Sequence, residues 1–370
     1  MLLPVLLLST AALASERRAE KIATRAEKAL LSGNVGRAWE LAGKAREKDP
    51  ENTRAMGIQA VLLIGSATPD NPMAAEMLNE GMALTNQLAA LAPDSPYLTL
   101  ARSTLQEMTD PALITEPRAE CSDEAHAQLE KAERAFGQRD MQTAGTFYRR
   151  ALDLCPEATA WWTYYGDTWF GLGDYAQARE NYQRSLDLDP CFWPAHRFWA
   201  NSLLQEGDLV GARDHTATAV ACNPEYTIGW RFLEMIVSEG GGTFGWQAVD
   251  KPALTTGEEG ANIDLFTSGP FSGPAGLVYQ TTRASSTGTP LEIERQAVEK
   301  TLTMFDELSG GLDPLWQALA AARDAGYLDE AIFIFLLDEA LLPEFLAHRD
   351  AHRDRLAAYV AAHLAPLSGE

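Results

Sequence analysis

Residues 156–190 read PEATAWWTYYGDTWFGLGDYAQARENYQRSLDLDP, a segment that begins and ends with proline. Pro190 lies 34 positions after Pro156, and Pro224 follows after the same interval. A fixed period of this size predicts a solenoid of stacked helical hairpins, because no single hairpin can bury its apolar face alone.

Inside this segment the large and small residues follow a fixed order. The first helix carries Trp162, Tyr165, Gly166 and Trp169, the turn is Gly173-Asp174-Tyr175, and the second helix carries Ala178, Tyr182, Ser185 and Pro190. This order resembles the tetratricopeptide repeat (TPR). The resemblance implies that the first helix of each hairpin lines a concave groove that binds extended peptides or partner helices.

The same register continues along the chain. Matching positions hold Ala132, Ala135, Ala144, Tyr148 and Ala151 before Pro156, and His196, Trp199, Ala200, Leu203, Ala212, Thr216 and Ala219 before Pro224. An earlier unit ends at Pro50 and supplies Ala26, Ala38, Ala42 and Ala45. Alanine lets two helices approach closely, and proline ends the second helix. The sequence therefore predicts an all-α, TPR-like superhelical solenoid.

We divide the chain into five segments by these patterns. They are a signal peptide (1–14), degenerate N-terminal repeats (15–120), central repeats (121–238), an irregular insert (about 239–290) and a C-terminal helical region with a cap (291–370). The interval between Pro50 and Pro93 is nine residues longer than the 34-residue period, so we expect the extra residues at 67–72. A further helix is expected over 96–108. A degenerate hairpin over 312–343 and a terminal helix over 350–365 complete the chain.

The insert interrupts the helical periodicity and is rich in Gly, Ser, Thr and Pro. Two short pieces, 263–266 and 277–280, are candidates for the strands of a hairpin. The segment also holds Phe244, Trp246, Phe266, Phe271 and Tyr279, which is more aromatic content than a plain linker needs. We expect it to pack against the solenoid, either as a lid across the groove or as an ordered insert without a binding role.

The N-terminus resembles an export signal. An apolar run, Leu2 to Leu8, is followed by Ala12-Leu13-Ala14, a small-x-small site for a signal peptidase. The run is too short to span a membrane, so no transmembrane segment is expected. The alternative is an amphipathic first helix of a cytosolic protein. The expected location is periplasmic or secreted.

Four cysteines, Cys121, Cys155, Cys191 and Cys222, occupy the two ends of two predicted hairpins. The ends of an antiparallel hairpin are neighbours, so we predict the disulfides Cys121–Cys155 and Cys191–Cys222. Each would stabilise the fold by about 3–4 kcal/mol on the chain-entropy view. A zinc site is the first alternative, but the cysteines lack the CxxC spacing that such sites usually have. Four reduced thiols are the second alternative, which would hold if the N-terminus were not a signal peptide.

The net charge of the chain and the motifs it lacks argue against several classes of function. The net charge of −22 argues against nucleic acid as a partner, because phosphate binding needs Lys and Arg. Motifs of hydrolases, metalloproteases, phosphate-binding loops and dinucleotide folds are absent, so neither catalysis nor a cofactor is expected. His348 and His352 have a metal-compatible spacing, yet neighbouring Arg349 and Arg353 favour a solvated helix face, and no metal is expected.

Helical spacing also predicts which side chains of the first helices face the groove. The candidate groove residues are Phe136, Asp167, Phe170, Arg197, Asn201 and Arg231. Arg197 and Arg231 occupy equivalent positions, and Asn201 lies one turn after Arg197. This is similar to the arrangement by which some TPR proteins hold a peptide carboxylate, although Glu133 and Asp167 place acids where further basic residues would be expected. The alternative is that both arginines pair with nearby acids.

The predicted function is an exported protein-interaction module or scaffold that binds a peptide or protein and performs no catalysis. The alternative is a small-ligand or glycan-binding protein that uses the aromatic residues of the central repeats, with the insert as a lid. The repeat register predicts that four of these aromatics lie in the core, namely Trp162, Tyr165, Trp169 and Trp199. It leaves Phe170, Phe192 and Trp193 free to face a ligand. A third class is an enzyme whose active site lies in the insert, but no catalytic site can be recognised in its sequence.

Overall fold

A computed structural model describes residues 3–31, 34–66, 74–93, 95–109, 119–247, 249, 255–257, 260–262, 269–271, 273–306 and 313–369. The chain divides into two compact units, Met1–Ala112 and Leu113–Glu370, which are described one at a time. Helices make up nearly all of the described secondary structure, so the predicted all-α class is confirmed.

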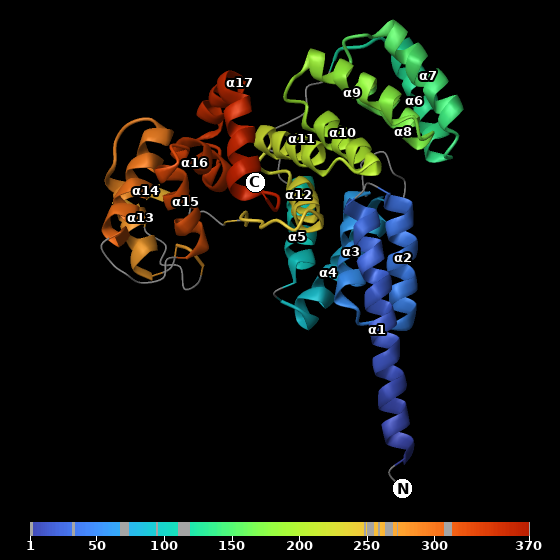
Figure 1. Cartoon of the computed structure of the whole chain (residues 1–370), viewed down its shortest axis with the longest axis horizontal. Coiled ribbons are helices and arrows are strands. Elements are labelled where there is room, and N and C mark those ends of the chain that lie inside the picture. The colour runs from blue at the N-terminus through green and yellow to red at the C-terminus, as the bar shows by residue number, and fades with distance from the viewer. Residues whose placement is uncertain are drawn as a thin grey trace. The chain divides into compact units, whose positions relative to one another are not determined.

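The first unit contains five helices, α1 (Leu3–Leu31), α2 (Val35–Lys48), α3 (Thr53–Gly65), α4 (Ala74–Leu91) and α5 (Pro96–Thr109). Helices α1 and α2 form a hairpin, and α3 packs against the other four. The predicted contact alanines Ala26, Ala38, Ala42 and Ala45 are fully buried. Figure 1 shows the first turns of α1 extending beyond the rest of this unit. The extra residues predicted at 67–72 lie outside the described residues.

The second unit begins with three consecutive hairpins. They are α6 (Asp123–Gly137) with α7 (Met141–Leu154), α8 (Thr159–Gly171) with α9 (Tyr175–Leu188), and α10 (Trp193–Glu206) with α11 (Leu209–Cys222). Helix α7 packs on α8 and α9 packs on α10, so the hairpins stack in sequence order (Figure 1). This is the predicted repeat array.

The same short-range contact starts the second helix of each hairpin. Asp140, Asp174 and Asp208 each accept a hydrogen bond from the backbone N–H three residues later, at 3.1, 3.1 and 2.9 Å. An aspartate in this position satisfies a helix donor that would otherwise lack a partner. Gly173 and Gly207 precede two of these caps with φ near +80°, a conformation that glycine adopts without a Cβ penalty. The turns therefore repeat with the helices.

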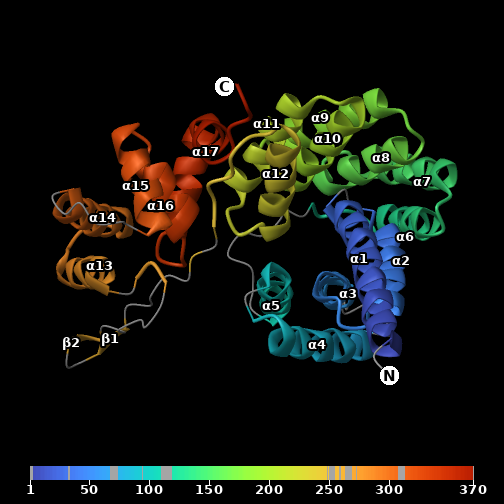
Figure 2. The same cartoon turned by 60° about the horizontal axis from the view of Figure 1, so that its bottom comes forward.

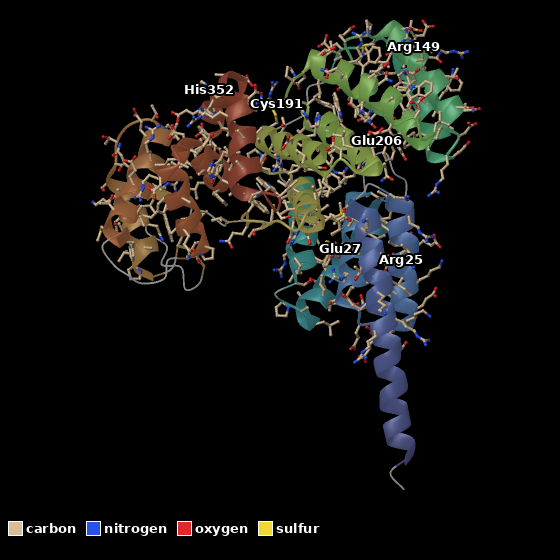
Figure 3. All side chains as sticks on the ribbon, in the orientation of Figure 1. Arg25, Glu27, Arg149, Cys191, Glu206 and His352 are labelled. Carbon is tan, nitrogen blue, oxygen red and sulfur yellow. A yellow bond between two sulfur atoms is a disulfide. The ribbon has the colours of Figure 1, made fainter. Side chains whose placement is uncertain are left out.

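Both predicted disulfides are present in the array. Cys121 and Cys155 have Cα atoms 5.7 Å apart, and Cys191 and Cys222 have Cα atoms 5.4 Å apart. Each bond joins the start of a hairpin to its end. Figure 3 marks Cys191 at the start of the third hairpin.

A C-terminal helical region follows the array. After α12 (Thr227–Glu239) and a two-strand hairpin of β1 (Thr255–Gly257) and β2 (Gly260–Asn262), the chain forms α13 (Gly273–Ser285), α14 (Pro290–Asp306), α15 (Pro314–Asp324), α16 (Leu328–Leu336), α17 (Leu342–Tyr359) and a π-helical turn η1 (Val360–Leu364). Helix α17 and η1 pack against α11 and cover the end of the array (Figure 2).

One large core joins the end of the array to this region. It contains Trp230 from α12 together with Phe271, Tyr279 and Trp316. The segment after α12 runs beside the C-terminus, because the Gly245 N–H donates to the Leu364 carbonyl at 2.8 Å. Trp246 stacks on Trp230 with ring centroids 4.5 Å apart. The segment that directly follows α12 therefore packs on α12 and on the C-terminus, whereas α13, later in the insert, packs chiefly on α14.

The structure differs from several expectations for the insert and the cap. Residues 277–280 lie in α13, so the predicted second strand is wrong, and the predicted first strand at 263–266 lies outside the described residues. Residues 273–285 of the predicted irregular insert are thus helical. The predicted hairpin over 312–343 is α15 and α16, and the terminal helix begins at Leu342, earlier than expected.

Candidate functional site

A tyrosine of the second helix holds an acid of the first helix in two successive hairpins. The Tyr148 hydroxyl donates to Glu133 Oε1 at 2.5 Å, and the Tyr182 hydroxyl donates to Asp167 Oδ1 at 2.7 Å. Both tyrosines are buried, while Glu133 is exposed and Asp167 is partly exposed. The hairpin packing therefore fixes the two acids at equivalent places on α6 and α8.

Asp167 has an unusual protonation equilibrium. Burial raises the pKa of Asp167 to about 7, and the nearby Glu133 charge acts in the same direction. The Tyr182 hydrogen bond and the Arg197 charge lower this pKa but do not compensate for burial. Burial therefore favours the protonated form of this carboxyl more than in an exposed aspartate.

Arg197 is placed differently from a groove residue that is open to solvent. Its side chain is only 3% exposed, and its guanidinium carbon lies 3.9 Å from the centroid of the Phe232 ring on α12. Burial lowers the pKa of Arg197, and the neighbouring Tyr226 and Asp167 oppose that shift. Asn201 is also only 3% exposed. In this conformation two members of the predicted carboxylate-binding set, Arg197 and Asn201, are covered.

The other predicted groove residues remain accessible to different degrees. Arg231 is about one-third exposed and pairs with Glu234 at 2.8 Å, which is the alternative considered for it. Phe136 and Phe170 are partly buried, and their rings approach Tyr148 and Tyr175, respectively. The structure thus leaves α6 and α8 as the open part of the first-helix row.

The aromatic residues of the central repeats are divided between the core and partly exposed positions. Phe192, which was expected to be free for a ligand, is fully buried, whereas Trp162, Tyr165, Trp169 and Trp199 are partly exposed. The indole N–H groups of Trp162 and Trp230 donate to the carbonyls of Pro156 and Pro224. These rings therefore tie each first helix to the preceding turn.

His196 occupies the position of these tryptophans in the third hairpin, on α10. Its Nε2 lies 3.1 Å from the Pro190 carbonyl, six residues earlier, as in the two tryptophan contacts. A carbonyl only accepts, so Nε2 carries the proton, and neutral His196 must accept at Nδ1. His215 Nδ1 lies 3.1 Å from that atom and is therefore its donor. The contact to the Pro190 carbonyl therefore places the proton of His196 on Nε2 and that of His215 on Nδ1.

A pocket of about 520 Å³ lies outside the repeat array, among α14, α15, α16 and α17. Its lining includes Arg295, Arg323 and Arg355, together with His348 and His352. Sequence reasoning did not find this pocket. The spacing of His348 and His352 was a partial signal, because it places both rings on one side of α17, where their centroids are 4.9 Å apart.

The described residues contain no group of three or more side chains suited to hold a metal ion. His348 Nε2 instead lies 3.0 Å from Glu330 Oε1. No helix in the described parts of the chain has the length and apolar character needed to cross a membrane.

Comparison with known proteins identifies one segment directly. Residues 159–190, which form the α8–α9 hairpin, match the tetratricopeptide repeat family model. No curated protein matches the chain.

Solved structures give weaker likenesses. The TPR domain of Sgt2 from Aspergillus fumigatus is 16% identical, covers 39% of this chain and 99% of its own, and has a TM-score of 0.32. A thermophilic TPR protein from Thermus thermophilus is 16% identical over 58% of this chain and 97% of its own, with a TM-score of 0.25. The TPR2AB domain of yeast Sti1, solved with pHSP90, is 14% identical over 60% and 96%, with a TM-score of 0.29. Since these TM-scores are below 0.5, the family assignment depends on the matched hairpin and the repeat geometry.

Proposed function

The chain is a tetratricopeptide repeat protein, and we propose that it is a protein-interaction module whose partner binds along α6 and α8 without catalysis. The supporting observation is the repetition of the same contacts in successive hairpins. Because Tyr148 and Tyr182 fix Glu133 and Asp167 in equivalent places, the first helices present one continuous row of side chains. A row that continues across hairpins suits an extended peptide or a helix better than a compact molecule.

The accessible part of this row differs from a basic carboxylate clamp. Glu133 is exposed and Asp167 partly so, whereas Arg197 is buried against Phe232. Phe136 and Phe170 lie one turn beyond the acids on the same helices. Partly exposed aromatic side chains commonly anchor partners at interfaces. We therefore assign the binding contacts chiefly to the aromatic and acidic side chains of α6 and α8.

Export is part of the proposal. Two disulfides are typical of proteins from oxidising compartments, and the N-terminal apolar run with its small-x-small site resembles a signal peptide. We place the protein in the periplasm or outside the cell. The masses of N-terminal peptides from the natural protein test this, because processing would leave Ser15 as the first residue.

The small-ligand alternative loses part of its original support. It required free aromatic rings in the central repeats and a lid formed by the insert. Phe170 and Trp193 are partly exposed, but Phe192 is buried, and Trp246 of the insert is stacked on Trp230 rather than lying over α8. The described aromatics of the insert therefore serve the core beside α12.

Site-specific photocrosslinking tests the proposed binding face. A photoreactive phenylalanine is placed at Phe136 or Phe170, and, as matched controls, at Arg150 or Arg184 on the exposed side of α7 and α9. Each pair is separated by one repeat, so the two sets differ only in the face they report. We expect one partner protein to crosslink to positions 136 and 170 in envelope extract, and not to positions 150 and 184.

The captured partner then allows a direct measurement. Purified partner should bind the Phe170→Ala variant at least tenfold more weakly than the unmodified protein, while Arg184→Ala leaves the affinity unchanged. Equal crosslinking from both faces, or equal affinity of Phe170→Ala and the parent, would refute binding along α6 and α8.

A further inference from the structure

The pocket among α14, α15, α16 and α17 concentrates positive side chains in a strongly acidic protein. The chain has 30 Lys and Arg against 52 Asp and Glu. Three arginines and two histidines nevertheless converge on this one hollow of about 520 Å³. That volume lies in the range of small-molecule binding sites. The three arginines match the three lining acids Glu299, Asp329 and Glu330 in number, so this lining departs from the acidic balance of the whole chain.

Two of the lining acids are already neutralised by lining cations. Arg295 donates from Nε and Nη2 to the two oxygens of Asp329, both at 2.8 Å. Arg355 donates from Nε to Glu330 Oε1 at 2.6 Å and from Nη2 to the Gly326 carbonyl. Glu330 also contacts His348 and is almost fully buried. Asp329 and Glu330 therefore serve to orient the two guanidinium groups.

These bonds use the same two nitrogens of each guanidinium. Among the described residues, Nη1 of Arg295 and Nη1 of Arg355 have no hydrogen bond, and both side chains are more than one-third exposed. Arg355 is further held over the Tyr327 ring, with its guanidinium carbon 4.6 Å from the centroid. Each arginine is thus fixed in place with one donor group remaining.

The rest of the lining contains Arg323, His352 and Glu299. Arg323 pairs with its neighbour Asp324, and its own side chain is 27% exposed. His352 lies at a kink in α17, where the backbone leaves helical geometry (φ −136°, ψ 30°), and Figure 3 marks it on that helix. Glu299 is the third lining acid. The Asp329 hydrogen bond raises the pKa of Arg295, and the charge of Glu299 acts in the same direction.

We propose that this pocket binds a small molecule carrying an oxyanion, either a phosphate or a carboxylate group. Oriented guanidinium groups match the geometry of these anions and bind them through charge-assisted hydrogen bonds. Arg295, Arg323 and Arg355 are the anion-binding residues, and Asp329 and Glu330 position two of them. The site is separate from the partner face on α6 and α8, so neither proposal depends on the other.

Histidine NMR signals of the full-length protein test this proposal. The chain has six histidines, so the ring Cε1–H resonances can be assigned with single His→Gln variants. Sodium phosphate and sodium succinate are titrated separately at constant pH and ionic strength, with sodium chloride as the reference. We expect saturable shifts of the His348 and His352 signals with at least one anion, and unchanged His196 and His215 signals. The anion that saturates at lower concentration identifies the preferred group.

Three variants make the result specific. Arg323→Gln should weaken binding at least fivefold, and Glu299→Gln should strengthen it, because that change removes a negative charge from the lining. Arg149→Gln, an exposed site on α7 with the same charge change as Arg323→Gln, should have no effect. A gain of affinity in Glu299→Gln cannot result from misfolding. Absence of saturable shifts with both anions, or equal affinities of Arg323→Gln and Arg149→Gln, would overturn the proposal.

Discussion

The repeat array and the C-terminal helices of the second unit are stabilised by different kinds of contact. In α6–α11 the polar contacts recur every 34 residues and join neighbours within a hairpin, as Tyr148–Glu133 and Tyr182–Asp167 do. In α13–α17 several contacts follow no repeat and join segments far apart in the sequence. Trp316 donates to the Pro270 carbonyl, and the Leu291 N–H donates to Glu344.

The cores differ in the same way. Alanines such as Ala144, Ala178 and Ala212 line the contacts within the array, so the hairpins meet closely through small residues. The C-terminal core instead contains large side chains and an ion pair between Arg283 and Glu294. When one repeated contact is removed, equivalent contacts remain in the other hairpins. A contact that occurs once has no equivalent elsewhere in the fold. We therefore expect the C-terminal helices to be the more sensitive region.

The largest expected effect follows from breaking that ion pair. Arg283 Nε lies 2.5 Å from Glu294 Oε1, and both side chains are less than one-tenth exposed. Arg283 also reaches Asp338, and Tyr279 donates to Glu294. Arg283→Met should lower the free energy of unfolding by about 3–5 kcal/mol, because it leaves a buried carboxylate without its counter-charge. Urea denaturation followed by circular dichroism measures the change.

The array offers a matched control for this prediction. Arg149 and Asp153 on α7 form an ion pair at 3.0 Å, with both side chains more than half exposed. Arg149→Met should change the free energy of unfolding by less than about 1 kcal/mol. Similar losses in the two variants would mean that burial does not distinguish the regions.

A smaller effect is expected from crowding a repeat contact. A Cβ atom added at Gly166 would lie 2.5 Å from a carbon of the Tyr182 ring and 3.1 Å from the Ala178 carbonyl oxygen. Gly166→Ala should therefore destabilise the protein by about 1–3 kcal/mol through overpacking. Gly137→Ala, at the end of α6 with no atom within 4 Å, should leave stability unchanged or slightly higher. Thermal unfolding of both variants checks the contrast, and a stable Gly166→Ala protein would show that the hairpin can open.

The difference between repeated contacts in the array and non-repeated contacts in the C-terminal helices also decides what the sequence alone could predict. The period revealed the three hairpins, their turns and both disulfide pairings, because these depend on contacts between residues of known register. The run Leu277-Val278-Tyr279-Gln280 was misassigned to a strand, since a short apolar run fits a buried helix equally well. It lies in α13, which packs on the following helix α14 and, through Tyr279, on Trp316 of α15, outside the 34-residue period.

The candidate sites show this limit again. Register placed Asp167 and Arg197 correctly on first helices, but it could not predict that Phe232 would cover Arg197. The charged pocket was not predicted, because its lining comes from four helices that share no motif. Only the spacing of His348 and His352 indicated that two of its residues share a face.

The smallest effect at neutral pH is expected from making one repeat more like its neighbour. His196 and His215 occupy the positions that Trp162 and Asn181 occupy in the preceding hairpin. Burial, together with the neighbouring His215, lowers the pKa of His196 to about 3, and burial lowers the pKa of His215 to about 4. Unfolded histidine has a pKa near 6.5. Between these values the unfolded chain binds protons that the folded chain does not, so stability is complete above pH 6.5 and is lost as the pH falls.

The double variant His196→Trp/His215→Asn removes both groups while copying a pair that the fold already accommodates. At pH 7 we expect its free energy of unfolding to lie within about 1 kcal/mol of the parent, because a tryptophan here can donate to the Pro190 carbonyl as Trp162 does to Pro156. At pH 4.5 the variant should be the more stable protein. Urea denaturation at the two pH values measures both terms. If parent and variant lose equal stability on acidification, the histidine pair does not cause the acid sensitivity, and other groups in the unit must bind the protons.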